Sequence, residues 1–219
     1  INHSLGSVPA MMIVKSSSDA RNWVVYHKDL GNTGVLQLNT TGGLPAARTI
    51  WNSTTPTDTS FQVDADNDVN GMTGSTAKEY VAYLFADNSS EDADDQMIKC
   101  GSYTGNGSAT GPVVNLGWEP QFVLIRNASD GGNWLIMDSM RGIPTGDESS
   151  VLAPNSSAAE SSLANLWGIN LTATGFQINV TQSQINASSQ TYIYMAIRAP
   201  MMVEPEVATD VFATVVGRS

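Results

Sequence analysis

The apolar residues of this chain fall in short runs that either alternate with polar residues or form unbroken blocks. VLQLNT (35–40) and FQVDA (61–65) alternate, which is the pattern of a strand with one face in water. MMIV (11–14), VAYLFA (81–86) and FVLI (122–125) are apolar throughout, which indicates strands buried on both faces. Turn-forming stretches such as GNTG, NSTTPTDT and TGNGSATG separate the runs. The pattern predicts an all-β, antiparallel protein.

The residues typical of helices are used sparingly, which supports the same prediction. One short helix is expected over residues 156–164. The expected strands cover residues 11–16, 22–30, 35–40, 60–65, 79–86, 112–117, 121–127, 133–140, 175–180, 191–199 and 210–216.

An internal repeat organises the sequence. When the chain is shifted by 111 residues, Leu5–Gly31 aligns without a gap on Leu116–Gly142, and eight of the 27 positions are identical. About two identities are expected between unrelated stretches of ordinary composition. The correspondence continues with small insertions through the pairs Trp51/Trp167, Phe61/Phe176 and Tyr80/Tyr192. The economical explanation is two tandem antiparallel β-sandwich repeats related by this offset.

The repeat predicts two domains and a tail. Residues 1–98 form repeat one and residues 99–199 form repeat two, while residues 200–219 read as a linker and one extra strand that lead into a further C-terminal region. Repeat two begins with a strand-like stretch, KCGSYTGNGSATG (99–111), that repeat one lacks, because Ile1 aligns with Pro112. We therefore expect the chain to be a fragment or processed product, and the missing first strand to lie upstream or to come from a neighbouring molecule.

Charge and composition exclude several classes of protein. The formal net charge is −11, with ten Lys and Arg against 21 Asp and Glu and no basic cluster, which argues against binding nucleic acid or anionic lipid. No run approaches the roughly 20 apolar residues of a membrane span, so no membrane insertion is expected. With Cys100 as the single cysteine and two histidines, His3 and His27, neither a disulfide framework nor a zinc site is expected.

One loop has part of the pattern of a calcium site. Asp66, Asp68 and Asn70 precede Gly71 with the alternate spacing of oxygen ligands in a calcium loop. The position where such a loop carries a bidentate Glu is Ala77, and the matching loop of repeat two has almost no acids. Two interpretations stay open, a bound calcium ion or a solvated Asp/Asn turn, and no other cofactor is expected. The acidic run at residues 91–95 is interpreted as a solvated linker.

No catalytic residues are predicted. The acids lie almost wholly in turns, except Asp138, which has Arg141 three residues on as a structural partner. There is no nucleophile elbow, phosphate loop or metalloprotease motif, and a nucleophilic Cys100 would need a histidine base from two distant candidates. We therefore expect a protein that is not an enzyme.

The aromatic residues point to core packing and one binding site. Those that recur in both repeats, such as Trp23 and Trp134, are interpreted as core, because each repeat must bury the same face. Trp118 stands where repeat one has Ser7, beside a turn, and is predicted as a ligand-binding residue whose exposed ring stacks on a sugar or a partner.

Several stretches of the chain form a recurring set of words: HSLGSVPAMMIVK, WVVYHKDLGNTGVLQLNTT, KCGSYTGNGSATGPVVNLGWEPQFVLIR, NWLIMDSMRG and TYIYMAIRAP. In these stretches the chain resembles, over nearly its whole length, the tandem β-repeat domains of structural and tail-fibre-like proteins of marine and other tailed bacteriophages. The resemblance implies a lectin- or jelly-roll-like sandwich, a longer parent protein and no catalytic residues.

Together these observations predict a virion structural protein, a tail-fibre or surface-appendage segment that takes part in host attachment or particle assembly. Its expected location is the virion, outside the host cell. The expected partners are other copies of itself, neighbouring virion proteins and a host-surface glycan. The alternative is a secreted carbohydrate-binding module of a bacterial surface protein.

Overall fold

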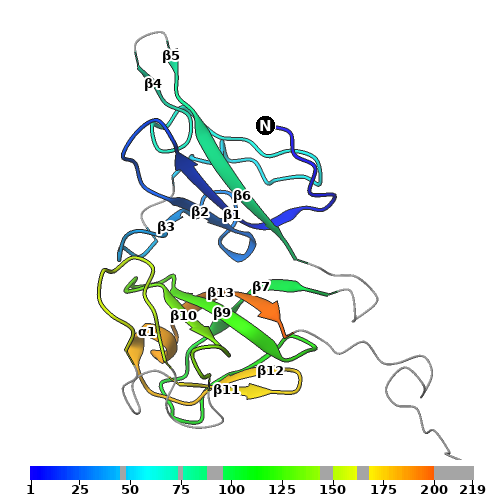
Figure 1. The fold of residues 1–219 in the computed structure, drawn as a ribbon, viewed down its shortest axis with the longest axis vertical. Helices are drawn as coiled ribbons and strands as arrows, with labels where there is room; N and C mark the ends of the chain where they lie inside the picture. The colour runs from blue at the N-terminus through cyan, green and yellow to red at the C-terminus, as the bar shows by residue number, and fades with distance from the viewer. Residues whose placement is uncertain (45–47, 74–75, 88–95, 144–149, 162–167, 200–219) are drawn as a thin grey trace, which may run out of the picture.

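The computed structural model describes residues 1–44, 48–73, 76–87, 96–143, 150–161 and 168–199. Within these ranges nearly all of the regular secondary structure is antiparallel strand, so the predicted all-β class is confirmed. Figure 1 shows two halves, residues 1–87 and residues 96–199, placed one above the other.

The first half is organised around a four-stranded sheet in the order β3-β2-β1-β6. A 3-10 helix, η1 (Lys28–Leu30), follows β2, and a separate hairpin joins β4 to β5. The strands are β1 (Pro9–Ser16), β2 (Val24–His27), β3 (Leu36–Gln37), β4 (Met72–Thr73), β5 (Thr76–Ala77) and β6 (Tyr80–Ala86).

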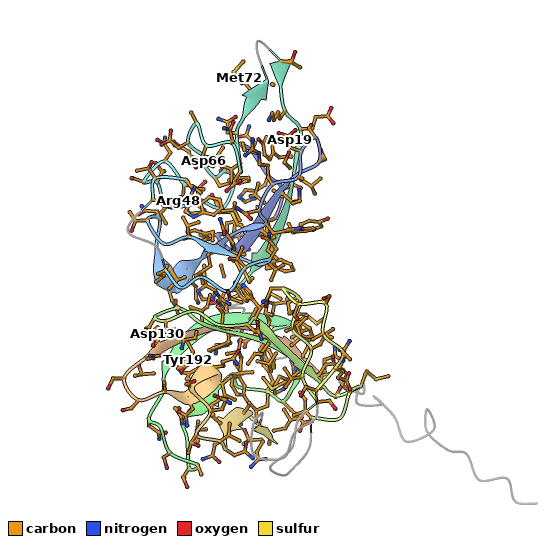
Figure 2. All side chains as sticks on the ribbon, turned by 90° about the vertical axis from the view of Figure 1, so that its left-hand side faces the viewer. Asp19, Arg48, Asp66, Met72, Asp130 and Tyr192 are labelled. Atoms are coloured by element: carbon orange, nitrogen blue, oxygen red, sulfur yellow. The ribbon has the colours of Figure 1, made fainter. Side chains whose placement is uncertain are left out.

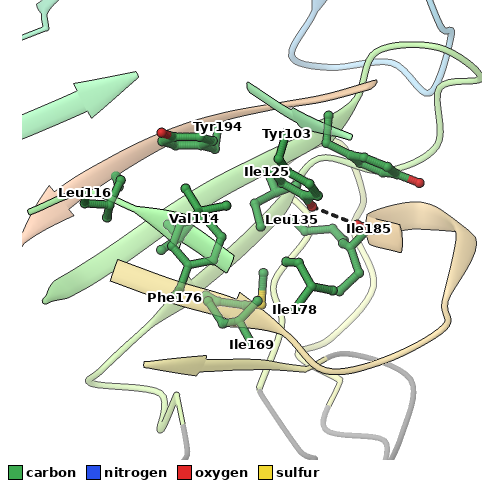
Figure 3. Close-up of a cluster of buried hydrophobic side chains, with 14 of the residues drawn as sticks. Tyr103, Val114, Leu116, Ile125, Leu135, Ile169, Phe176, Ile178, Ile185 and Tyr194 are labelled. Atoms are coloured by element: carbon green, nitrogen blue, oxygen red, sulfur yellow. Dashed lines mark hydrogen bonds between the residues drawn. The ribbon is translucent and has the colours of Figure 1, made fainter. Parts of the chain in front are cut away.

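The second half is a two-layer sandwich. A four-stranded sheet in the order β10-β9-β13-β7 packs on a three-stranded sheet in the order β11-β12-β8, and side chains from both sheets fill the space between them (Figure 3). One short helix, α1 (Ser183–Asn186), closes an end. The strands are β7 (Ile98–Thr104), β8 (Val113–Asn115), β9 (Pro120–Asn127), β10 (Leu135–Asp138), β11 (Ile169–Thr172), β12 (Gly175–Ile178) and β13 (Thr191–Arg198).

Buried apolar side chains form three clusters along the long axis of the molecule. The first cluster lies between the sheet of the first half and the irregular chain that carries Ile50, Trp51 and Phe61. The last cluster lies inside the sandwich of the second half. The middle cluster joins the two four-stranded sheets to each other. The central strands β1 and β9 are therefore covered on both faces, which explains why they are apolar at consecutive positions.

The two four-stranded sheets correspond in strand order and in register. The order β2-β1-β6 matches β10-β9-β13. Met11 pairs with His27, and the residues 111 positions later, Phe122 and Asp138, also pair. The β1–β6 and β9–β13 ladders agree in the same way once one inserted residue before β13 is allowed for.

A side-chain motif recurs as well. The Tyr80 hydroxyl accepts a hydrogen bond from the Gly71 N–H (2.7 Å) and donates to the carbonyl four residues before that glycine (2.9 Å). Tyr192 binds the Ala187 N–H (2.7 Å) and the carbonyl four residues before that alanine (2.5 Å) in the same way. Each hydroxyl ties its sheet to a neighbouring segment, which is the loop before β4 in the first half and α1 in the second.

Some expected elements differ from those observed. Residues 60–65 form only an isolated bridge at Ser60, because the facing chain near Asn2 offers one short stretch to pair with. The helix expected over residues 156–164 is absent from its described part, where Ser161 bridges to Val151. The helix α1 was not expected. The acidic run 91–95, Trp167 and the tail 200–219 lie outside the described residues.

Candidate functional site

Corresponding faces of the two four-stranded sheets pack against each other. Ile13 of β1 and Val25 of β2 share the middle cluster with Leu124 of β9 and Met195 of β13. Leu124 is the residue that aligns with Ile13 in the repeat, so each sheet uses the same face for this contact. Polar and aromatic side chains lie at the border of this contact.

A loop of the first half covers one end of the second sheet. The Leu44 N–H donates to the Ala128 carbonyl (3.0 Å), and the Gly132 N–H donates to the Thr41 carbonyl (2.8 Å). The Trp134 indole Nε1 donates to a first-half carbonyl at Gln37 (2.9 Å). Two of these bonds join main chains and the third joins a side chain to a main chain, and together they fix the two halves to one another.

Beneath this loop lies a buried cation–aromatic pair. The Arg126 guanidinium lies 5.5 Å from the centre of the Trp134 ring, and both side chains are almost inaccessible to solvent. It donates to the carbonyls of Gly132 and Gly42, one from each half. Burial lowers the pKa of Arg126 to about 10, so the group stays charged at neutral pH.

The corresponding pair of the first half is partly exposed. Lys15, which aligns with Arg126, places its Nζ 6.0 Å from the centre of the Trp23 ring. The Tyr83 ring stacks beside Trp23, with the ring centres 6.4 Å apart and an angle of 18° between the planes. Val81 lies directly across from Lys15 in the β1–β6 ladder. We call these four residues the Trp23 surface.

Exposure distinguishes the Trp23 surface from its counterpart. Val81 and Tyr83 are 45% and 47% exposed, whereas Ile193 and Met195, at the same positions of β13, are 1% and 6% exposed. The second sheet covers only part of the first, so one end of the apolar face is left open to solvent. A half-exposed tyrosine stacked on a tryptophan is a surface that a partner can cover.

Polar groups border the Trp23 surface. Asn39 accepts a hydrogen bond from the Trp23 N–H (2.9 Å) and donates from its side-chain amide to Asn22 (3.1 Å). A hollow of about 210 Å³ is lined by Trp23, Leu38, Asn39 and Pro154, which come from both halves. Ring faces beside amide groups and an ammonium group are the chemistry that binds sugars, through stacking and hydrogen bonds.

Trp118 does not offer the exposed ring that was expected. It is 4% exposed and belongs to the core of the second half. Its indole N–H is buried with no hydrogen-bond partner among the described residues. The ring is packed in this core, so its surface is not available for stacking on a ligand.

The acidic loop at residues 64–71 is held by contacts within the protein. Figure 2 shows Arg48 beside Asp66, and their side chains form an ion pair with 2.7 Å between Nη2 and Oδ2. The other carboxylate oxygen of Asp66 accepts the Asp68 N–H (2.8 Å), and the Asn70 N–H donates to the Asp66 carbonyl (2.6 Å). The described residues contain no group of three or more His, Cys, Asp or Glu side chains placed to hold a metal ion. These contacts are those of an Asp/Asn turn, and the calcium interpretation stays a prediction.

The reactive side chains are buried or paired. Burial raises the pKa of the Cys100 thiol to about 12, so the thiolate is scarce at neutral pH. His27 is fully buried; desolvation lowers its pKa, and its Nε2 lies 3.1 Å from the Tyr194 carbonyl. Asp138 forms an ion pair with Arg141, the partner expected from the sequence. None of these groups is presented as a nucleophile or base on an open surface.

The fold and this surface define a class of protein, an antiparallel β protein with two stacked four-stranded sheets and an aromatic surface beside their junction. The chain belongs to the family described as a domain of unknown function (DUF7483), whose profile matches residues 1–200. No curated protein and no solved structure matches it. Among the described residues, no helix is long and apolar enough to cross a membrane.

The recurrence of Trp23 and Trp134 in the two repeats predicts that both rings are core. The structure assigns the two rings different environments, because Trp134 is buried under the loop at residues 41–44 and Trp23 lies at the open end. The available signal was at one position of the last strand, where the first half has Tyr83 and the second half has the less polar Met195. The more polar side chain belongs to the half whose face meets water.

Proposed function

We propose that the chain is a non-enzymatic structural segment of an exposed virion appendage, such as a tail fibre, that takes part in host attachment or particle assembly. The observation that carries the proposal is the direct stacking of the two halves. A shared apolar cluster and main-chain hydrogen bonds join them, so the segment is stiff along its length. A stiff module with polar loops is suited to presenting a binding surface away from a particle.

Three further observations support this proposal. The two halves agree in strand order, register and the tyrosine motif, which supports two tandem copies of one unit. The strongly acidic composition favours solubility and resists non-specific adhesion. The resemblance to tandem β-repeat domains of phage structural proteins points the same way.

Imaging of the native source tests the proposal. Antibodies raised against the recombinant chain are expected to label a tail, fibre or capsid surface in electron micrographs of particles, and cryo-electron microscopy is expected to show density that fits the two stacked sheets. Labelling of a secreted protein with no particle attached would contradict the virion proposal.

A second candidate function, a secreted carbohydrate-binding module, is favoured by the Trp23 surface. Its stacked rings, the Asn39 amide and the Lys15 ammonium group offer both stacking and hydrogen bonds. A glycan array probed with the wild-type chain and with Trp23→Ala and Tyr83→Ala is the test. Met140→Ala is the matched control, because Met140 is 94% exposed in the second half, away from these rings. Binding that Tyr83→Ala removes and Met140→Ala preserves would support this function, and equal binding by all variants would refute it.

A further inference from the structure

The outer edge of β6 differs from the corresponding edge of the second half. In the second half, β13 lies between β9 and β7. In the first half, β6 pairs with β1 on one side, and no described strand pairs with it on the other. The place that corresponds to β7 is therefore open among the residues that the structure describes.

The main chain of β6 directs hydrogen-bonding groups toward this open side. The Ser17 N–H donates to the Glu79 carbonyl (3.0 Å), which sets the alternation of the ladder with β1. By that alternation, Tyr80, Ala82 and Leu84 direct their N–H and C=O groups away from β1. In the second half, the corresponding alternate residues of β13 are the ones that bond to β7, as the Arg198 N–H to Met97 carbonyl bond (2.9 Å) shows.

The side chains of β7 show what such a strand contributes. The Tyr103 ring stacks on Tyr192 with ring centres 5.0 Å apart and an angle of 11° between the planes. On the opposite face, Cys100 enters the cluster between the two sheets and Ile98 packs against it. In register, Tyr103 faces Tyr192 and Cys100 faces Met195. β7 thus extends both apolar layers of its half.

The first half has matching side chains that no described strand covers in this way. Tyr80 stands at the position of Tyr192 and is partly exposed, whereas Tyr192 is fully buried. Tyr83, at the position of Met195, is half exposed. The backbone edge, the ring at Tyr80 and the apolar surface at Tyr83 all lie where a β7-type strand would cover them.

We propose that the outer edge of β6 accepts a strand of the β7 type from another polypeptide segment. The segment runs antiparallel to β6, with an aromatic side chain against Tyr80 and small or apolar side chains against Tyr83 and Phe85. It takes up the main-chain groups of β6 that no described strand pairs with, and it covers the exposed part of the Trp23 surface, which is the mode of recognition known as strand addition. The proposal depends on the geometry of the sheets and not on the virion assignment.

The test uses the whole chain and a synthetic peptide with the sequence 97–105, carrying Cys100→Ser to prevent oxidation. Amide exchange measured by NMR is expected to slow at least about tenfold at Tyr80, Ala82 and Leu84 when the peptide is in excess. A peptide N-methylated at the three positions that face these residues is expected not to bind. Its matched control, N-methylated at the two intervening positions, is expected to bind, because those amides face away from β6.

A substitution in the protein, in place of a change in the peptide, tests the same edge of β6. Ala82→Pro removes an outward N–H and leaves the ladder to β1 intact, a place where edge strands tolerate proline. The peptide's dissociation constant is expected to rise at least about tenfold. If this variant does not fold, the pair of N-methylated peptides still decides the question with the unaltered protein.

Three results would overturn the proposal. One is no slowing of exchange at β6 with excess peptide, and another is equal binding by the two N-methylated peptides. The third is concentration-dependent self-association of the chain through β6, seen by sedimentation and by protection of the same amides without peptide, because the occupant would then be a second copy. None of these results bears on whether the protein is located on a virion.

Discussion

Replacing Arg126 with methionine tests whether the junction between the two halves contributes to stability. Arg126 donates charge-assisted hydrogen bonds to Gly132 and Gly42, each worth about 1.5–3 kcal/mol, and its cation–aromatic contact with Trp134 adds about 2 kcal/mol when desolvated. A methionine at this position buries no charge, so the folded variant avoids a desolvation cost of several kcal/mol. We expect Arg126→Met to lower the free energy of unfolding by about 3 kcal/mol.

The control is the corresponding residue of the first half. Lys15→Met removes a more exposed contact with Trp23, worth about 0.5–1 kcal/mol, and two local bonds of Nζ to the carbonyls of Ser16 and Asp19 (2.6 and 3.0 Å). We expect a loss of about 1 kcal/mol or less. Both variants replace a cationic side chain with methionine at aligned positions. The difference between their losses in the free energy of unfolding therefore measures the contribution of the junction.

Urea denaturation followed by tryptophan fluorescence measures both values, and thermal unfolding checks them, since about 3 kcal/mol corresponds to a fall of roughly 6–12 °C for a protein of this size. The wild type is expected to unfold in one transition. Equal losses for the two variants, or a loss under about 1 kcal/mol for Arg126→Met, would refute the account of the junction.

Three more predictions follow from single positions. Burial lowers the pKa of His27, although its bond to the Tyr194 carbonyl and the charges of Asp29 and Asp87 oppose this shift. Because the pKa is lower in the folded state, the unfolded state takes up a proton first as the pH falls below 6.5. The free energy of unfolding should therefore fall by at most about 1.4 kcal/mol per pH unit between pH 6.5 and 5, and His27→Gln should reduce this slope. In denaturant titrations, Gly131→Ala should lower the free energy of unfolding by at least about 2 kcal/mol more than Gly142→Ala does. Both glycines have a positive φ (82° and 84°), but an added Cβ lies 2.4 Å from the Gly43 nitrogen at Gly131 and meets open space at Gly142. Cys100, with a pKa of about 12, should resist iodoacetamide at pH 8 in the native protein and react after unfolding, so rapid native labelling detected by mass spectrometry would contradict its burial.

Much of the fold followed from the sequence because the apolar runs of β1 and β9 are long and unambiguous. Such runs predict central strands covered on both faces, and β1 and β9 have that environment. The same prediction for residues 81–86 is wrong, because β6 lies at the edge of its sheet and Val81 and Tyr83 are about half exposed. The alternation of residues 61–65 was a weaker guide. A strand needs a partner of matching length, and the chain near Asn2 supplies a single bridge to Ser60.

The binding surface could not be predicted in the same way. A period of two tells which residues share a face of a sheet, but not how far a second sheet extends over that face. Trp23 and Trp134 are identical in type and local sequence position, yet only the loop at residues 41–44 decides which ring is buried. Trp118 was misjudged for the same reason, since a turn beside a residue does not show what lies over its ring.

The contact between corresponding faces has a consequence for how such a protein is held together. Two separate molecules that join through the same face form an isologous dimer, which dissociates on dilution. Here both partners belong to one chain, so the effective concentration of one for the other is on the order of millimolar at any protein concentration. The junction around Ile13 and Leu124 therefore persists at dilutions where an unlinked pair would separate.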